Sequence, residues 1–323
     1  MAYMSMRSPL FPFAIVIALA LAPCSYGLNQ PTRQSSSLAS TSTTLNYHGG
    51  PLLSTPGSIN IYLVWYGTFP PQEMAPIQDF FASLGSSGGQ QKPAVATWWS
   101  TILAYKDKAG KPVSGRVRVA AFHEDKTCSL GKNIKRPQIA NYVKKMMDTQ
   151  VFPFDSNGVY LFLTAKDVVV ERFCSGSCGF HENMVVSPRG RVVYAHVGDP
   201  GTQCPGLCAW PYAIPAYGPP GNPLVSPNGI GIDGMIMNIA TILAGAATNP
   251  FKTGYFQGNA LAPLEAVTAC PGIFGPGAYP GYPGELIVDK LTKASYNAYG
   301  ANGKKFLLPA IWDLKGLNCK ALA

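Results

Sequence analysis

Three short apolar stretches constrain the fold more than any other feature of this chain. They are rich in β-branched and aromatic residues and read SINIYLVWYG (58–67), GVYLFLTA (158–165) and RVVYAHVG (191–198). Runs of this length and composition are typical of buried strands. Segments with apolar residues at helical spacing lie between them, at 74–84, 95–105 and 137–148. In GRVRVAAFH (115–123) apolar and polar residues alternate, as in a strand with one solvent-exposed face. Because helices and strands alternate, we predict a layered α/β domain with a mixed β-sheet.

A fourth apolar segment, NGIGIDGMIMNIATILAGAATNP (228–250), admits three interpretations: a dinucleotide loop, a helix with metal ligands, or a buried helix. Its glycines spell G-x-G-x-x-G (Gly229, Gly231, Gly234) but follow Ser-Pro-Asn rather than a strand, so the nucleotide match is weak. Apolar residues recur at three- and four-residue spacings, and Asp233 can cap the first turn. We predict that 233–247 is a buried helix that binds neither nucleotide nor zinc.

The N-terminus predicts export. Arg7 precedes the apolar stretch FPFAIVIALALA (11–22), and small residues follow at Ser25 and Gly27, which is the pattern of a secretory signal peptide. About 12 apolar residues are too few for a membrane helix, which needs roughly 20. We predict a signal peptide at 1–27, a flexible Ser/Thr-rich leader at 28–46, and a single domain at 47–323 with no membrane span.

Basic residues are concentrated in one segment. The net charge is +9, and residues 104–148 carry eleven Lys or Arg against four Asp or Glu. A basic surface on an exported protein would attract polyanions such as acidic polysaccharides, through an interaction that salt screens. Alternatively, these lysines only keep the surface soluble. Export leaves no role for nucleic acid as a partner, and the sequence does not fix the oligomeric state.

Seven cysteines remain after cleavage of the signal peptide. CSGSC and CPGLC are two C-x-x-x-C pairs whose spacing suits a structural zinc. Export favours disulfides instead, because thiols oxidise outside the cell. We predict three disulfides, with Cys128 as the free thiol and the connectivity left open. The disulfide candidates are Cys174, Cys178, Cys204, Cys208, Cys270 and Cys319.

Two long segments, 200–229 and 270–286, are rich in Pro and Gly and have little regular pattern. Long loops inside compact domains are usually functional or pinned, so the first of these disulfide-tied loops is a candidate recognition surface, and the second has a similar character. Trp210 and the exposed tyrosines could stack on sugar rings, or they could simply fill irregular structure.

The catalytic patterns in the chain are incomplete. GSSGG (85–89) matches G-x-S-x-G, but a helix precedes it, which indicates a flexible turn. None of the four histidines completes H-E-x-x-H, since Val185 stands where His181-Glu182 would need the second histidine. We interpret Cys178 and His181 in CGFHE as a disulfide-bonded cysteine beside a surface histidine. The sequence therefore indicates no catalytic, cofactor-binding or metal-binding residue.

A series of long motifs resembles a known family. They are FCSGSCGFH, YAHVGD, CPGLCAWP, PLVSPNG, DGMIMNIATILAGAATNPFKTGYFQG, APLEAVTACPGIFG, YPGYPGELIVDK and SYNAYGANGKKFLLPAIWD, followed by a last cysteine near the C-terminus. In this order they resemble the EXORDIUM-like (phosphate-induced) proteins of land plants, over nearly the whole mature chain. The resemblance implies an apoplastic, cell-wall-associated protein linked to cell expansion and brassinosteroid-responsive growth.

The resemblance also bears on the apolar helix. More distant relatives outside plants resemble metallopeptidases with A-H-E-L-x-E where this chain has ATILAG (240–245). On this alignment Thr241 replaces the histidine, Ile242 the catalytic glutamate and Gly245 the second acid, while Glu265 remains as a downstream carboxylate. One carboxylate cannot hold a catalytic zinc, which needs three protein ligands. The resemblance thus implies a degenerate zincin-like scaffold without metal.

These observations favour a non-catalytic, secreted protein that binds the wall or a ligand, with an acidic cell-wall polysaccharide or an extracellular receptor as partner. The alternative is a secreted hydrolase acting on wall glycan or peptide, with Glu265, Asp233 and His181 assembled by the fold. A third hypothesis is a structural wall component held by basic charge alone.

Overall fold

A five-stranded mixed sheet forms the centre of the computed structural model, which describes residues 44–85, 91–219 and 221–322. Its strands, in spatial order, are β3 (Val117–Asp125), β2 (Ile59–Tyr66), β5 (Gly158–Thr164), β8 (Gly190–Gly198) and β7 (Gly179–Val186). The first four are mutually parallel, and β7 runs antiparallel to β8. The prediction of an α/β domain with a mixed sheet is confirmed.

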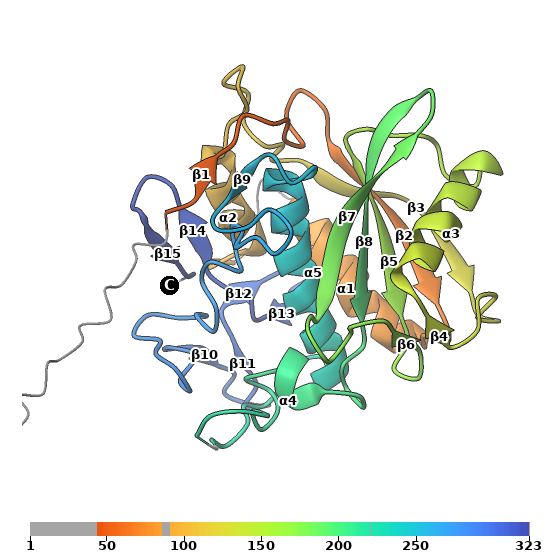
Figure 1. Ribbon diagram of the computed structural model, residues 1–323. Helices are drawn as coiled ribbons and strands as arrows, with labels where there is room; N and C mark the ends of the chain where they lie inside the picture. The colour runs from red at the N-terminus through yellow and green to blue at the C-terminus, as the bar shows by residue number, and fades with distance from the viewer. Residues whose placement is uncertain (1–43, 86–90, 220, 323) are drawn as a thin grey trace, which may run out of the picture. The chain divides into compact units, whose positions relative to one another are not determined.

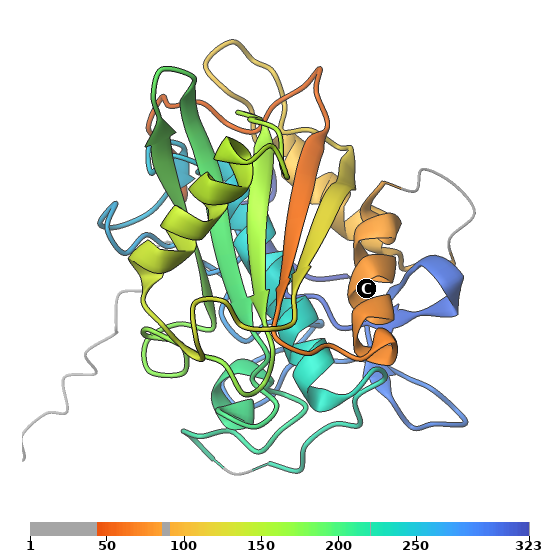
Figure 2. The same ribbon diagram turned by 90° about the vertical axis from the view of Figure 1, so that its right-hand side faces the viewer.

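Helices cover both faces of this sheet. Helix α3 (Arg136–Asp148) lies on one face, and α1 (Pro71–Leu84) and α5 (Ile230–Thr248) lie on the other (Figures 1 and 2). Tyr142 of α3, for example, stands edge-on to Phe162 of β5, with ring centroids 5.3 Å apart. Strands covered on both faces need apolar side chains in both directions, which explains the near-continuous apolar runs of β2 and β5.

The remaining helices are short. α2 (Val95–Ser100) continues into a 3₁₀ turn at Thr101–Ala104, α4 is Pro205–Cys208, and a second 3₁₀ turn is Ala301–Gly303. The helices and strands predicted from 58–67, 74–84, 95–105, 115–123, 137–148, 158–165 and 191–198 all occur near those positions. Strand β7 was not predicted.

Helix α5 is a core element. It begins three residues before the predicted start at 233, and most of its side chains are buried. Among the described residues it is the one helix long and apolar enough to cross a membrane, but 72% of that window is buried in the fold. The helix begins after Gly229, without a side-chain cap, so the prediction that Asp233 caps it is wrong.

The glycines that open α5 are required by close packing rather than by a nucleotide. A Cβ on Gly231 would lie 2.2 Å from Oδ1 of Asp199, the residue that follows β8. A Cβ on Gly234 would lie 2.7 Å from the ring of Pro200. Gly229 has a φ of 100°, which favours glycine. The G-x-G-x-x-G pattern therefore belongs to a helix that sits tightly against the end of β8.

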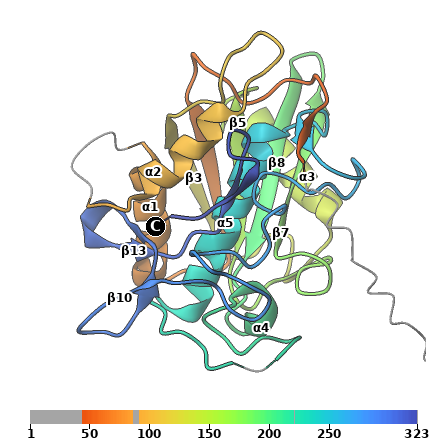
Figure 3. The same ribbon diagram turned by 90° about the vertical axis from the view of Figure 1, so that its left-hand side faces the viewer.

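Short two-stranded sheets, formed mostly by the chain beyond α5, lie on the side of that helix away from the main sheet (Figure 3). The pairs are β1 (Asn46–Tyr47) with β9 (Tyr255–Phe256), β10 (Ile287–Val288) with β11 (Ser295–Tyr296), β12 (Ala298–Tyr299) with β13 (Lys305–Phe306), and β14 (Ile311–Asp313) with β15 (Asn318–Lys320). A further pair, β4 (Asn133–Ile134) with β6 (Val169–Val170), lies outside the main sheet.

The described residues contain three disulfides, as predicted. They join Cys174 to Cys204, Cys178 to Cys208, and Cys270 to Cys319, while Cys128 is free. The first two bridges tie the segment before β7 to the two ends of α4, at its N-cap Cys204 and its last residue Cys208. The third ties the second Pro/Gly-rich loop to β15.

The structure gives no support to a zincin-like scaffold. The α5 positions aligned with metal ligands are Thr241, Ile242 and Gly245, and Thr241 Oγ1 donates a hydrogen bond to the carbonyl of Met237. Within residues 44–85, 91–219 and 221–322, no three His, Cys, Asp or Glu side chains are grouped as metal ligands. The predicted signal peptide, nearly all of the predicted leader and most of GSSGG lie outside the described residues.

Candidate functional site

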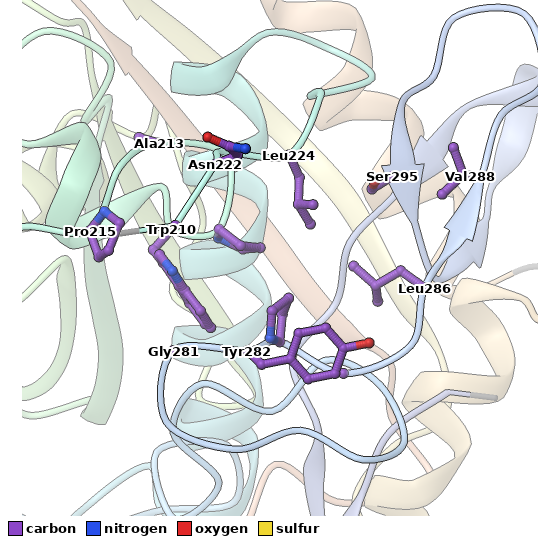
Figure 4. A pocket seen from close by; sticks show the side chains of 14 residues that line it. Trp210, Ala213, Pro215, Asn222, Leu224, Gly281, Tyr282, Leu286, Val288 and Ser295 are labelled. Atoms are coloured by element: carbon purple, nitrogen blue, oxygen red, sulfur yellow. The ribbon is translucent and has the colours of Figure 1, made fainter. Parts of the chain in front are cut away.

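The two Pro/Gly-rich loops meet around Trp210. Together they enclose three adjoining hollows, with volumes of about 400, 660 and 260 Å³, and Trp210 lines all three. The first and second hollows share Trp210, Pro215 and Gly281, which form the ridge between them. We call this region the Trp210 surface. Figure 4 shows the side chains of Trp210, Leu224, Tyr282 and Leu286 around the first hollow.

Covalent and backbone bonds hold the first loop in place. Cys208, two residues before Trp210, is bridged to Cys178. Within the loop the amide of Ala216 donates to the carbonyl of Gly206 at 3.0 Å, and the amide of Leu224 donates to the carbonyl of Pro211 at 3.0 Å. These bonds fold the segment back on itself on both sides of Trp210. A Pro-rich stretch with few amide donors thereby acquires a defined path.

The second loop is closed at its base. The amides of Phe274 and Gly275 both donate to the carbonyl of Pro283 at 2.9 Å. At the tip, Tyr279 and Tyr282 exchange backbone hydrogen bonds of 3.0 and 2.8 Å, and their ring centroids are 5.1 Å apart. This short excursion therefore presents two tyrosine rings side by side.

A small apolar cluster supports both loops from below. It consists of Tyr212, Met237, Phe274 and Leu307, and Trp210 packs on Phe274 with ring centroids 5.9 Å apart. Met237 belongs to α5, so the surface rests on the core helix. The hydroxyl of Tyr212 is buried and donates to the carbonyl of Ser295 at 2.7 Å. The Trp210 surface is thus built on packed residues rather than on loops alone.

The chemistry of this surface is apolar and uncharged. None of the described residues that line its three hollows is Asp, Glu, Lys, Arg or His. Aromatic rings are accessible on it, with Tyr217 82% exposed, Tyr279 64% and Tyr282 36%. Indole Nε1 of Trp210, the Asn222 amide and these phenol hydroxyls form no hydrogen bond with another described residue. The surface can therefore contact a neutral ligand through ring faces and a few free hydrogen-bonding groups.

His181 and Glu265 form a buried pair elsewhere in the fold. Nε2 of His181, on β7, lies 2.9 Å from Oε2 of Glu265, and Asn249 Nδ2 donates to Oε1 of the same carboxylate at 2.7 Å. The histidine side chain is only 6% exposed, so the prediction of a surface histidine is wrong. Burial disfavours the imidazolium, but the adjacent Glu265 carboxylate outweighs it and raises the pKa of His181.

Gly245 makes room for this pair. A Cβ at this position of α5 would lie 2.4 Å from Oε2 of Glu265 and 3.2 Å from Nε2 of His181. The two partners are 84 residues apart in sequence and match no motif, so sequence reasoning could name both residues but not their contact.

Asp233, the third residue of the hydrolase hypothesis, lies apart from this pair. It accepts hydrogen bonds from Ser226 Oγ at 2.5 Å and from the amide and Nδ2 of Asn228, both at 2.8 Å. Burial raises its pKa to about 6. Twelve residues of helix, or about 18 Å, separate it from Gly245 beside Glu265. The fold thus brings His181 and Glu265 together but does not bring Asp233 to them, and none of the three lines the Trp210 surface.

The basic residues of segment 104–148 lie on several elements of the fold. Its residues are distributed over an exposed loop, the edge strand β3, the turn that follows, and helix α3. Three of its lysines are in ion pairs: Lys126 with Glu124, Lys132 with Asp167, and Lys144 with Asp148. The exposed loop carries Lys106, Lys108 and Lys111 without an ion pair to any described residue. Arg116, Arg118 and Lys145 are likewise exposed and in no ion pair with a described residue, so unpaired positive charge is present on several of these elements.

Comparison with known proteins identifies the family. The conserved region of phosphate-induced protein 1 matches residues 45–322 as a family model. The chain belongs to the phosphate-induced protein 1 family. Protein EXORDIUM-like 2 of Arabidopsis thaliana is 46% identical over 285 residues, covering 86% of this chain and 89% of that protein. Protein EXORDIUM of Arabidopsis thaliana is 45% identical over 290 residues, covering 86% and 89%.

Protein PHOSPHATE-INDUCED 1 of Nicotiana tabacum is 44% identical over 284 residues, covering 86% of this chain and 88% of that protein. The resemblance to EXORDIUM-like proteins is thereby confirmed. No solved structure matches the chain. The region that defines the phosphate-induced protein 1 family includes both loops of the Trp210 surface and the His181–Glu265 pair, so both features lie within the family's shared domain.

Proposed function

We propose that this member of the phosphate-induced protein 1 family is an exported, non-catalytic binding protein of the plant cell wall, and that the Trp210 surface is its ligand-binding site. The observation that carries the proposal is the convergence of two covalently tied loops on one neutral, aromatic surface. Loops of this length are usually functional or pinned, and here they are pinned around three adjoining hollows. Through this ligand the protein would act in brassinosteroid-responsive cell expansion.

The positive charge has a separate role in this proposal. Lys106, Lys108 and Lys111 would hold the protein loosely to acidic wall polysaccharide, through contacts that salt screens over about 10 Å. The Trp210 surface carries no charge, so ligand binding there would depend little on salt. An extracellular receptor is the other class of partner that the Trp210 surface could accept.

The proposal is tested with the protein recovered from the medium of secreting plant cells, applied to an array of neutral wall oligosaccharides and extracellular peptides. The binding buffer contains about 0.5 M salt, which screens contacts made by surface charge. We expect binding under these conditions and loss of binding on Trp210→Ala. The matched control is Phe122→Ala, which removes a 54% exposed ring from strand β3 outside the hollows and should leave binding unchanged. If no array component bound in a Trp210-dependent way, the proposed function would be wrong.

A further inference from the structure

The buried His181–Glu265 pair connects the segments that lead into the two loops of the Trp210 surface. On one side, His181 follows Cys178 by three residues, and the disulfide from Cys178 to Cys208 fixes the part of the first loop that precedes Trp210. The histidine itself belongs to strand β7, which pairs with β8 along its whole length. This side of the pair is therefore anchored by sheet and covalent bonds.

On the other side, Glu265 opens the turn 265–270 that leads into the second loop. The backbone amide of Glu265 donates to Thr268 Oγ1 at 2.7 Å. Val267 and Thr268 line the third hollow, of about 260 Å³, together with residues of the first loop, Trp210 among them. One wall of this hollow is therefore formed by the turn whose first side chain is the Glu265 carboxylate.

The surroundings of the pair favour a protonated histidine. Glu265 Oε2 lies 2.9 Å from Nε2 of His181, and Gly245 adjoins the ring in the last turn of α5, whose carbonyl end favours positive charge. Nδ1 has no hydrogen-bond partner among the described residues, so the ring is held through Nε2 alone. The other charged groups that act on it are Glu182 of β7 and Lys252 beyond α5, which form an ion pair with each other at 2.5 Å. Glu265 is therefore the decisive partner.

The charge of this pair changes with pH. Burial disfavours the imidazolium, but the Glu265 carboxylate outweighs it and raises the pKa of His181 above the ordinary value of 6.5. The stabilisation by the ion pair is therefore fully present below about pH 6.5 and is lost as pH rises through the raised pKa. The neutral ring can still donate from Nε2, but Glu265 then remains buried without a countercharge. Such a carboxylate is more stable in water, which favours opening of the turn that carries it.

The two sides of the pair differ in how firmly they are held. Strand β7 is part of the main sheet, whereas the turn 265–270 belongs to no helix or strand. We propose that the His181–Glu265 pair is a pH-sensitive clamp on the Trp210 surface, which holds the 265–270 wall of the third hollow in place in acid and releases it in alkali. The disulfide at Cys270 keeps the released wall attached at its far end. This inference rests on the proposed function and names a regulation of the same site.

The test follows Trp210 in the full, oxidised protein without any ligand. Trp210 is partly exposed, so a neutral quencher such as acrylamide acts mainly on it. The other four tryptophans are at most 7% exposed: Trp65, Trp98, Trp99 and Trp312. We expect acrylamide quenching to increase from about pH 6.5 to about pH 9, and the unfolding constant in urea to rise by up to about ten-fold per pH unit within that range. Trp210→Phe should abolish the increase in quenching, which assigns the signal to this residue.

Two variants remove the charge of the pair and keep its hydrogen-bonding shape. His181→Gln retains an amide donor for Glu265 but cannot become charged, and Glu265→Gln removes the carboxylate. Both should flatten the pH dependence of quenching and reduce that of the unfolding constant. His123→Gln is the matched control, because it replaces a histidine of strand β3 outside the pair, and it should behave like the wild type. A wild-type profile in His181→Gln, or a wild type whose quenching does not change with pH, would overturn the clamp.

A second measurement applies should either variant fail to fold. Histidine-selective NMR of the wild-type protein follows His181 directly, and its titration midpoint should coincide with that of the change in quenching. Two clearly different midpoints would overturn the inference. Because none of these measurements uses a ligand, their failure would leave the Trp210 surface standing as a binding site. A negative ligand array together with a pH-dependent Trp210 signal would instead overturn the proposed function and leave the clamp as a property of the fold.

Discussion

Replacing Gly245 by alanine should unfold the protein at a distinctly lower temperature. The added Cβ would lie 2.4 Å from Oε2 of Glu265, closer than any real contact, so the carboxylate must move. That movement breaks its 2.9 Å bond with His181 and its 2.7 Å bond with Asn249. Removing one partner of a buried ion pair costs about 3–5 kcal/mol, which we take as the cost of displacing the carboxylate, and alanine returns about 1 kcal/mol of helix propensity.

The net loss is therefore about 2–4 kcal/mol. At about 2–4 °C per kcal/mol for a domain of this size, the melting temperature should fall by roughly 5–15 °C. Circular dichroism of the oxidised protein at neutral pH measures this shift. Gly176→Ala is the matched control, because a Cβ there would meet nothing within 4 Å.

The cause of the loss can be tested in a second background. Glu265→Ala removes the carboxylate that the new methyl group would strike. In that background Gly245→Ala should be neutral, or should stabilise by up to about 1 kcal/mol through helix propensity. An equal loss in both backgrounds would refute the steric explanation, since the clash would then not involve Glu265.

Three further predictions concern stability. Replacing both Cys270 and Cys319 by serine should cost about 4 kcal/mol, because this bridge closes a loop of 49 residues; urea unfolding measures the loss, and peptide mapping under non-reducing conditions should recover the bridge itself. Leu243 is 4% exposed, so Leu243→Ala should leave a cavity beside α5 and cost about 2–5 kcal/mol of stability. An unchanged urea midpoint would contradict this burial. Burial lowers the pKa of His196 to about 3. Between about pH 6.5 and pH 3 the unfolded chain therefore binds more protons than the folded protein. Stability should fall as pH falls in this range, by up to about 1.4 kcal/mol per pH unit. His196→Phe should flatten this dependence in urea titrations across the same pH range.

The central sheet could be predicted because its buried strands have a distinctive local amino-acid composition. β2 and β5 are covered on both faces, so almost every residue is apolar and the strands stand out from the helices between them. β7 escaped prediction because it is an edge strand, in which polar residues such as Glu182 and Asn183 interrupt the apolar pattern. A strand that is only partly covered carries a weaker sequence signal.

The candidate site could be predicted in part. The two Pro/Gly-rich loops stood out by length and composition, but their meeting at Trp210 depends on contacts between segments some 60 residues apart, as in the packing of Trp210 on Phe274. Asp233 was mistaken for a cap because its position at the start of the apolar stripe suits one. In the structure its carboxylate instead binds Ser226 and Asn228, upstream of the helix start.

Two of the disulfides join the same pair of segments. Cys174–Cys204 and Cys178–Cys208 have the same sequence separation of 30 residues and Cα distances of 5.6 and 5.4 Å. A single covalent link would leave the two segments free to pivot about it, whereas a second link four residues further along removes that rotation. Trp210 follows Cys208 by two residues, so its indole is carried on a segment that cannot turn. The aromatic ridge is therefore oriented when the sulfurs oxidise, and a ligand that arrives later does not have to order it.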